Sequence, residues 1–164
     1  MCGFVGFTNY INNSNIVLEN MMNKIIHRGP DSGGTYIDDG IALGFRRLSI
    51  IDLAQGDQPI LNEDGSKVLL FNGEIYNFQS IREKLIAAGH KFKTKTDSEV
   101  LLHGYEEYGK NLLNMLRGMF AFVIWDKNTK ELFGARDFFG IKPLYYSLSG
   151  KSFLFGSEIK SFLP

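Results

Sequence analysis

The protein is a chain of 164 residues in which eighteen basic and eighteen acidic side chains balance, so its formal net charge at pH 7 is zero. A balanced charge argues against a nucleic-acid or anionic-membrane partner, because both attract a basic surplus. Aromatic residues make up 13% of the chain, which is typical of a globular protein and not of a disordered one. No apolar run reaches the length of a membrane span, and no signal-peptide pattern is present. We therefore expect a single soluble domain over residues 1–164.

The only cysteine, Cys2, stands directly behind the initiator residue Met1. One cysteine cannot form an internal disulfide, which fits a reducing compartment, so we expect a cytoplasmic protein. Removal of Met1 would leave one residue with both a thiol and a free α-amine. Such an amine titrates at about 7.7–8.0 and can take the proton of the thiol, as in an N-terminal nucleophile. The alternative is a small buried cysteine at the start of a strand.

Short apolar segments separated by turn residues organise the first half of the chain. Residues 4–7 predict a buried strand, and a helix capped by Ser14 or Asn15 is expected next. Residues 27–34 are rich in Gly, Pro and Asp and predict a loop. A hairpin is expected around Asp38-Asp39-Gly40, with strands at 36–37 and 41–45. The expected helix has one apolar face, formed by Leu18, Met21, Met22, Ile25 and Ile26.

The second half begins with the apolar residues 68–71, which predict a strand that stops at a sharp turn over residues 72–74. Three helices are expected to follow. Asn77 would cap the first, and Thr96 with Glu99 has the spacing of a capping box for the second. The three helices are expected over 77–89, 96–109 and 112–116.

Two further hairpins are expected near the end of the chain, and no regular alternation of strand and helix appears. Antiparallel sheets with helices packed on their faces, an α+β class, are therefore predicted. The hairpins pair residues 119–125 with 132–135 and residues 144–146 with 153–155. Residues 157–164 predict the start of a helix with nothing after it, so we expect this chain to be part of a longer protein.

A series of short motifs runs through the whole chain. They are Met1-Cys2-Gly3-Phe4-Val5-Gly6, His27-Arg28-Gly29-Pro30-Asp31, Arg47-Leu48-Ser49-Ile50-Ile51-Asp52, Asn72-Gly73-Glu74-Ile75-Tyr76-Asn77, Asp97-Ser98-Glu99, Arg136-Asp137, Gly140-Ile141-Lys142-Pro143-Leu144-Tyr145-Tyr146 and Ser157-Glu158-Ile159-Lys160. In this order they closely resemble the N-terminal glutaminase domain of glutamine-hydrolysing asparagine synthetases. These are class II glutamine amidotransferases of the N-terminal-nucleophile hydrolase type.

The resemblance implies a four-layer αββα sandwich of two antiparallel sheets and a defined catalytic chemistry. Cys2 would attack the side-chain amide of L-glutamine, release ammonia, and then be freed by water. The side chain of Asn72 and the backbone N–H of Gly73 would stabilise the oxyanion. An ordinary Asn-Gly turn is the alternative explanation of this pair.

The resemblance also assigns residues to the two charged ends of glutamine. Arg47 would bind the α-carboxylate with its planar guanidinium group, and Asp97 and Glu74 would lie near the α-ammonium. The backbone of Leu48, Ser49, Ile50 and Ile51 would line the same pocket. Each charged residue has an alternative: Arg47 as half of an exposed Arg46-Arg47 pair, Asp97 as a helix-dipole partner, and Glu74 as a solvated side chain.

No cofactor or metal is expected in this chain. In the family, ATP and Mg²⁺ belong to a C-terminal synthetase domain, whose signature is missing here. The three histidines have no metal-ligand spacing, and His103 is interpreted as a packing residue within a helix. Phe45 and Asp57 depart from the family pattern, and neither is expected to touch a residue with an assigned role.

Two other functions remain open from the sequence. The glutaminase could serve another ammonia acceptor, such as a sugar phosphate or a purine precursor. The chain could also be a glutamine-binding domain without turnover.

Overall fold

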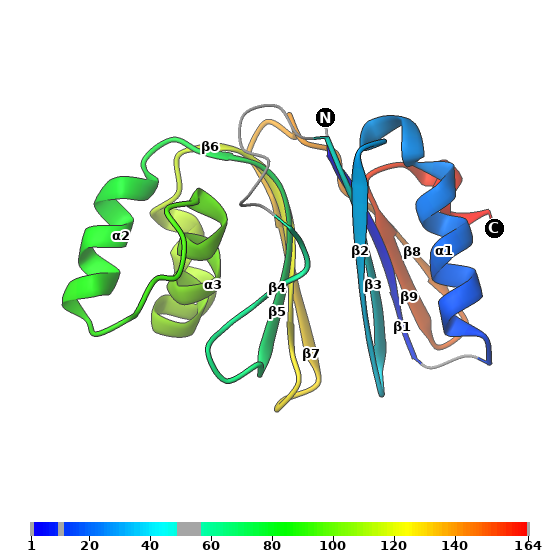
Figure 1. The fold of residues 1–164 in the computed structure, drawn as a ribbon, viewed down its shortest axis with the longest axis horizontal. Helices are drawn as coiled ribbons and strands as arrows, with labels where there is room; N and C mark the ends of the chain where they lie inside the picture. Colours follow the sequence, from blue (N-terminus) through cyan, green and yellow to red (C-terminus); the bar gives the residue numbers. More distant parts are fainter. Residues whose placement is uncertain (1, 10–11, 49–56, 164) are drawn as a thin grey trace.

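The computed structural model describes residues 2–9, 12–48 and 57–163, which form two antiparallel sheets that face each other (Figure 1). The first sheet has the strand order β2 (Ser32–Asp38), β3 (Ile41–Arg47), β1 (Gly3–Thr8), β9 (Ser152–Gly156), β8 (Tyr145–Ser149). The second has the order β4 (Ile60–Leu61), β5 (Lys67–Ile75), β6 (Gly118–Asp126), β7 (Glu131–Arg136).

Helices cover the outer face of each sheet. Helix α1 (Ser14–Lys24) packs on β1 and β3 of the first sheet, and α2 (Phe78–Ala87) and α3 (Asp97–Tyr108) lie over the second (Figure 1). The predicted α+β class and the αββα sandwich are therefore confirmed. None of the helices in the described ranges is long and apolar enough to cross a membrane.

Three apolar layers hold the sandwich together, and the alternation of side chains along each strand sorts residues among them. On β5, Leu69 and Phe71 face the helices, whereas Val68 and Leu70 face the other sheet. The central strands are thus apolar on both faces, which explains why residues 68–71 form a continuous apolar run.

The predicted turn at residues 72–74 is wrong. Strand β5 continues to Ile75 because β6 pairs with it residue by residue, from Lys67 opposite Asp126 to Ile75 opposite Gly118. Gly73 allows β5 and β6 to approach each other closely, and it does not form a turn. A Cβ atom on it would lie 2.2 Å from the carbonyl oxygen of Met119, so only glycine fits here.

Asn77 and Thr96 occupy the N-cap positions of α2 and α3 as predicted, but no side-chain cap hydrogen bond forms at either helix. The side chains of Asn77 and Glu99 bind elsewhere. The amide of Asn77 donates to the carbonyl of Met115 at 2.8 Å, and its oxygen accepts the N–H of Arg117 at 2.8 Å. Glu99 turns back to the connection between α2 and α3, where its two oxygens accept backbone N–H groups at 2.7 Å. Both side chains therefore fix tertiary contacts and not helix ends.

Three smaller expectations also differ. Strand β2 begins at Ser32, inside the predicted loop, because its pairing with β3 extends to Arg47. The helix expected over 112–116 is a 3₁₀ turn at Gly109–Asn114, and another 3₁₀ turn at Ile159–Phe162 follows β9. Helix α1 has no side-chain cap, and the residue before its first turn is Asn13.

The start of β1 is fixed by residues from both ends of the chain. The backbone of Phe4 exchanges hydrogen bonds with Ser157, through the Ser157 hydroxyl at 3.0 Å and its N–H at 2.9 Å. The guanidinium of Arg28 donates to the carbonyl of Cys2 at 3.1 Å and pairs with Glu158 at 3.0 Å. The motifs that contain Arg28 and Glu158 therefore meet beside the chain terminus and hold it in place.

Glu158 is an ionised group that stabilises the folded state. Burial alone would raise its pKa, but hydrogen bonds from Arg28, Lys160 and His27 lower the pKa to about 2 from an ordinary value of 4.5. Because the folded pKa lies below the unfolded one, this stabilisation is complete above the unfolded pKa and is lost as the pH falls from about 5 towards 2.

We expect Glu158→Gln to lower the free energy of unfolding at pH 7 by about 1–3 kcal/mol, since Arg28 would lose its charged partner. The melting temperature should fall by roughly 3–10 °C. The difference between the two proteins should narrow as the pH falls below about 5. Urea titrations at several pH values measure this, and a difference that stays constant down to pH ~4 would contradict it.

Candidate functional site

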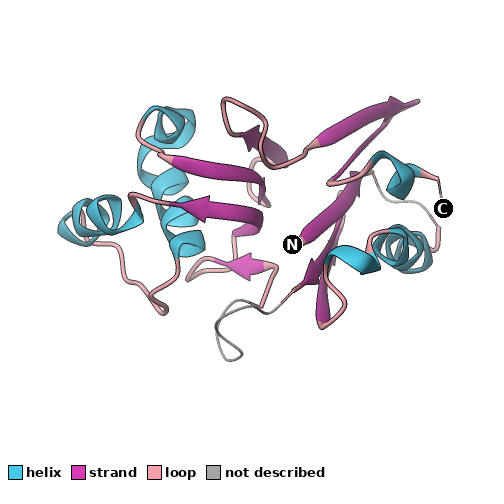
Figure 2. Ribbon diagram, turned by 90° about the horizontal axis from the view of Figure 1, so that it is seen from above, coloured by secondary structure: helices cyan, strands magenta, loops and turns pink. Residues whose placement is uncertain are grey.

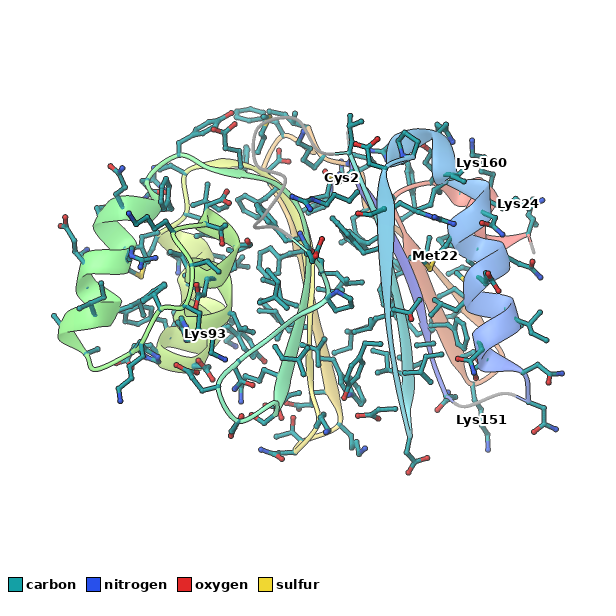
Figure 3. All side chains as sticks on the ribbon, in the orientation of Figure 1. Cys2, Met22, Lys24, Lys93, Lys151 and Lys160 are labelled. Atoms are coloured by element: carbon teal, nitrogen blue, oxygen red, sulfur yellow. The ribbon has the colours of Figure 1, made fainter. Side chains whose placement is uncertain are left out.

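Cys2 lies at one end of the layer between the two sheets, immediately before β1 (Figure 3). Seen from above, the N-terminus stands between the sheets (Figure 2). The side chain is half-buried and packs against the apolar cluster that fills this layer. Its Sγ atom accepts the N–H of Leu48 at 3.4 Å and lies 3.7 Å from the carbonyl oxygen of the same residue. The sulfur is thus held against the end of β3 while it faces the second sheet.

The alternation of side chains brings the assigned residues to the same layer. Phe45 on β3 belongs to the cluster between the sheets, so Arg47, two residues later, points to the same side. Leu70 on β5 belongs to that cluster as well, so Asn72 and Glu74 follow it onto the same side. These residues come from both sheets and face the layer that holds Cys2.

Asn72 offers a buried hydrogen-bond donor to the layer between the sheets. Its side chain is 3% exposed, and among the described residues its Nδ2 atom has no hydrogen-bond partner. A buried polar group without a partner costs about 1–3 kcal/mol, so such a group needs an explanation. A ligand oxygen placed in this layer would supply the missing acceptor.

A second free donor follows from the direction of the N–H groups along β5. Alternate residues of a strand direct their N–H groups to the same edge. The N–H of Phe71 donates to the side-chain oxygen of Gln58 at 2.6 Å, and the N–H of Ile75 donates to Asp97 Oδ2 at 2.8 Å. The N–H of Gly73 lies between them on this edge, away from β6, and no described residue accepts it.

Arg47 is a buried cation, so the alternative of an exposed arginine pair is wrong. It is 9% exposed and lines a cavity of about 210 Å³ with Phe45 and Gln58. Its Nη1 atom donates to Asp57 Oδ1 at 3.0 Å, and the Asp57 side chain is 89% exposed. The expectation that Asp57 touches no assigned residue is therefore also wrong. Because this pair reaches solvent, it contributes little energy and can exchange for another carboxylate.

Asp97 and Glu74 place negative charge on the second sheet, across the layer from Arg47. Burial raises the pKa of Asp97, the N–H of Ile75 opposes that rise, and the negative charge of nearby Glu74 adds to it. Asp97 is the first residue of α3, and its carboxylate also accepts the N–H of Ile75 at the end of β5. It is thus more than a helix-dipole partner. A cation bound near both carboxylates would relieve their repulsion.

The structure also reveals positioning residues that the sequence did not single out. Gln58 uses both atoms of its amide to bind the backbone of Phe71 at 2.9 and 2.6 Å, which extends the edge of β5 beyond β4. Arg28 and Glu158 hold Cys2 in place, and the only signal for them was their opposite charge in two of the motifs that carry the resemblance. Ser49, Ile50 and Ile51 lie outside the described residues.

The sandwich of two facing sheets, with Cys2 directly before the first strand, has counterparts among solved structures. A solved structure titled glutamine phosphoribosylpyrophosphate amidotransferase from B. subtilis superposes with a TM-score of 0.82 over 98% of this chain and 43% of that one, at 24% identity. A second structure, titled as the allosteric regulatory enzyme of purine biosynthesis, gives a TM-score of 0.81 at 24% identity. At this level of identity the likeness concerns the fold.

A family model described as "Glutamine amidotransferase domain" matches residues 1–164, and the chain belongs to this family. It is 48% identical to asparagine synthetase [glutamine-hydrolyzing] 1 of Bacillus subtilis, over 99% of this chain and 27% of that protein. It is 43% identical to asparagine synthetase [glutamine-hydrolyzing] 2 of Arabidopsis thaliana, over 98% of this chain and 28% of that protein. The resemblance inferred from the motifs is confirmed, and the chain spans just over a quarter of the length of these relatives.

Two buried asparagines offer a matched test of the free donor. We expect Asn72→Ala to change the free energy of unfolding by less than about 1 kcal/mol, because Nδ2 has no bond to lose. Asn62→Ala should cost about 2–3 kcal/mol, since Asn62 is 6% exposed and binds Ser66, Glu106 and the N–H of Lys67. Urea denaturation of both variants measures this, and equal losses would show that Asn72 is bound in the folded protein.

Proposed function

We propose that this chain is the glutaminase domain of an asparagine synthetase, in which Cys2 hydrolyses the side-chain amide of L-glutamine to glutamate and ammonia. The observation that carries the proposal is a pair of donors, Asn72 Nδ2 and the N–H of Gly73, for which no described residue provides an acceptor. Both lie on β5, which faces the layer that holds Cys2. Such donors are suited to a charge that appears only in the transition state.

The reaction follows from the chemistry of the terminus. The α-amine of Cys2 takes the thiol proton, and the thiolate attacks the amide carbon of glutamine. The developing oxyanion receives hydrogen bonds from Asn72 and Gly73. The protonated amine then gives its proton to the leaving nitrogen, ammonia departs, and a glutamyl thioester remains on Cys2. Water attacks the thioester with the amine again as base, which releases glutamate.

The two ends of the substrate meet charges from opposite sheets. The α-carboxylate binds Arg47 on the first sheet, in exchange for the solvent-exposed Asp57. The α-ammonium lies near Asp97 and Glu74 on the second sheet. Glutamine in the free amino-acid form carries both charges, so this arrangement selects it over glutamine within a peptide. Leu48 to Ile51 are proposed to line the same pocket with their backbone.

Similarity to asparagine synthetases favours aspartate as the final ammonia acceptor. The relatives are longer than this chain, and we propose that a further, C-terminal domain uses ATP and Mg²⁺ to activate aspartate. A sugar phosphate or purine precursor as acceptor is less well supported, because the two solved structures named above are only 24% identical to this chain. We propose that the 164 residues form one domain, without a cofactor in the glutaminase reaction, and that the protein works in the cytoplasm.

Ammonia release is the first test. We expect the wild-type chain to release ammonia from glutamine and Cys2→Ala to release none above background. Asn72→Ala should lower kcat by about a hundredfold to a thousandfold with little change in KM, because its amide acts in the transition state. Glutamate formation in a coupled assay measures both variants. Full kcat in Asn72→Ala would remove Asn72 from the oxyanion site.

Binding of the ammonium should depend on the ionisation of Asp97. Because its pKa is raised, we expect KM for glutamine to increase with falling pH earlier than an ordinary aspartate would cause. Asp97→Asn keeps an acceptor for the N–H of Ile75 but loses the charge, so KM should be higher by roughly 10- to 100-fold and its pH dependence in that range should disappear. A lower melting temperature with unchanged KM would assign Asp97 a structural role instead.

The mechanism requires Cys2 to be the first residue. With Met1 attached, the Cys2 nitrogen is a peptide amide with no basic lone pair, and the thiol loses its base. General-base assistance is worth about a hundredfold to ten-thousandfold in rate. We expect preparations that retain Met1 to be less active by this factor than those that begin at Cys2. Intact-mass analysis beside the glutaminase assay measures it, and full activity with Met1 retained would exclude the amine as base.

A further inference from the structure

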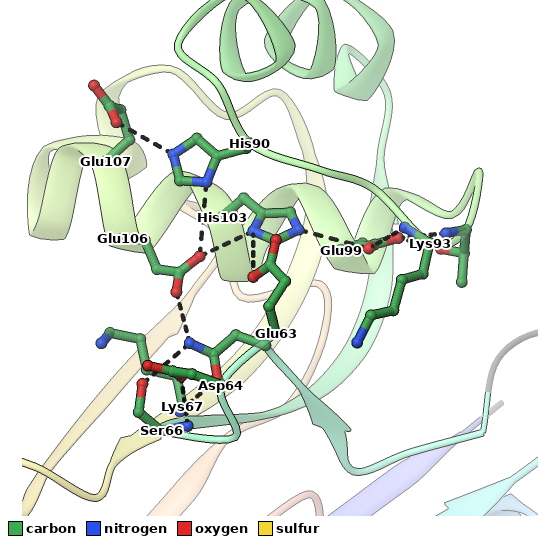
Figure 4. A network of polar contacts seen from close by, with 12 residues as sticks. Glu63, Asp64, Ser66, Lys67, His90, Lys93, Glu99, His103, Glu106 and Glu107 are labelled. Carbon is green, nitrogen blue, oxygen red and sulfur yellow. Dashed lines mark hydrogen bonds and ion pairs between the residues drawn. The ribbon is translucent and has the colours of Figure 1, made fainter.

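A cluster of histidine and glutamate side chains (Figure 4) gathers around α3, which covers the outer face of the second sheet (Figure 1), whereas Cys2 packs in the layer between the two sheets. Two of its members, His103 and Glu106, come from α3, and His90 comes from the connection between α2 and α3. Glu63 reaches the cluster from the turn between β4 and β5. The spacing of these residues in the sequence does not indicate a common site, because three separate segments bring them together.

The ligand atoms of His90, His103 and Glu106 are arranged at the separations that a small cation needs, and Glu63 adjoins this group of three. The Nδ1 atom of His103 lies 2.9 Å from Glu106 Oε2, and the Nδ1 atom of His90 lies 3.8 Å from the same oxygen. Glu63 Oε2 lies 3.8 Å from His103 Nδ1. The ligand atoms of His90, His103 and Glu106 all lie within 4.8 Å of one another. Tetrahedral Zn²⁺ with bonds of about 2.0–2.1 Å separates its ligands by roughly 3.4 Å, so small side-chain shifts would complete the site.

In His90, His103 and Glu106, the nitrogen or oxygen atom that would not bind the ion already has a polar neighbour in the protein. Glu107 Oε2 lies 3.2 Å from His90 Nε2, and Glu99 Oε1 lies 3.5 Å from His103 Nε2. The remaining oxygen of Glu106 accepts the amide of Asn62 at 2.7 Å. Carboxylates behind metal-binding histidines fix the ring orientation and raise ligand basicity. The cluster thus contains both a possible coordination sphere and the groups that usually support one.

The charge balance also favours a cation. Four carboxylates, from Glu63, Glu99, Glu106 and Glu107, surround two imidazoles. His103 is only 1% exposed, and the edge contact of its ring with Phe92, at 4.7 Å between centroids, limits its movement. The positive charge of Lys67 helps to lower the pKa of Glu106, but the Lys67 ammonium pairs with Asp126 at 3.2 Å.

We propose that His90, His103, Glu106 and Glu63 bind a divalent transition-metal ion of the Zn²⁺ type. Two imidazole nitrogens with carboxylate oxygens suit this class of metal. The ion joins α3, the connection before it and the β4–β5 turn, and so it locks the helical layer to the edge of the second sheet. The role is structural, because the sheet separates this site from Cys2.

Calorimetric titration with Zn²⁺ tests the proposal on chain that has been dialysed against a chelator. The Cys2→Ser variant serves as the background, since it removes the thiol as a competing ligand. We expect one Zn²⁺ per chain, a higher melting temperature with the metal, and a tetrahedral visible spectrum when Co²⁺ replaces Zn²⁺. His90→Asn should lower the affinity by more than about tenfold, and Glu107→Gln by about tenfold.

The chain offers a matched control in its third histidine. His27 is exposed and lies outside this cluster, so His27→Asn should leave the affinity and the Co²⁺ spectrum unchanged. Glu63→Gln, at a partly exposed position, provides a second ligand variant that spares the buried His103. Absence of saturable Zn²⁺ binding would leave the cluster as a proton-linked ion network and overturn the proposal. Binding that His90→Asn and Glu63→Gln do not weaken would place the metal elsewhere and overturn it equally.

Discussion

The site depends on the way β1 is fixed at its first residue. A nucleophile that is also a chain terminus must keep its amine free, yet a terminus is ordinarily the least ordered part of a chain. Here β1 lies inside its sheet, paired with β3 on one side and β9 on the other. The hydroxyl and N–H of Ser157 bind the backbone N–H and carbonyl of Phe4, and the guanidinium of Arg28 donates to the carbonyl of Cys2. These hydrogen bonds involve the Cys2 carbonyl and the backbone of Phe4, and not the Cys2 nitrogen. They therefore position Cys2 and leave its amine available.

The second sheet supplies the hydrogen-bond donors that face the nucleophile. Strand β5 extends beyond β4, and its free edge is partly covered by Gln58 and Asp97, which accept the N–H groups on either side of Gly73. The intervening N–H and the Asn72 Nδ2 group find no acceptor among the described residues. Within the described part of the chain, folding leaves the buried Asn72 donor unsatisfied, which costs stability. Preorganised donors of this kind stabilise the transition state, in which the substrate develops negative charge.

Hydrophobic periodicity predicted most of the elements, because each strand or helix must bury a defined face. The run at residues 68–71 correctly indicated a strand, and the structure shows that both of its faces are buried. Local rules failed where tertiary partners competed for the same groups. Asn77 and Glu99 are good capping residues by position, yet Met115, Arg117 and backbone N–H groups of the α2–α3 connection bind them instead. Asn72-Gly73 had the composition of a turn, but pairing with β6 keeps it in a strand.

The residue types of the site could be predicted from motifs, but their partners could not. Nothing in the sequence indicates that Asp57 pairs with Arg47, or that His90 and His103 share Glu106, because these contacts depend on how separate segments pack. The same limit applies to Arg28 and its contact with Cys2.

The most direct measurement is to locate the glutamyl group during turnover. Protein that begins at Cys2 is mixed with glutamine, quenched in acid, digested, and analysed by mass spectrometry. The proposed mechanism requires a glutamyl thioester on the Cys2 peptide, and none on any peptide of Cys2→Ala. A glutamyl group on another residue, or hydrolysis by the wild-type chain without any trapped adduct under single-turnover conditions that accumulate intermediates, would contradict Cys2 as the nucleophile.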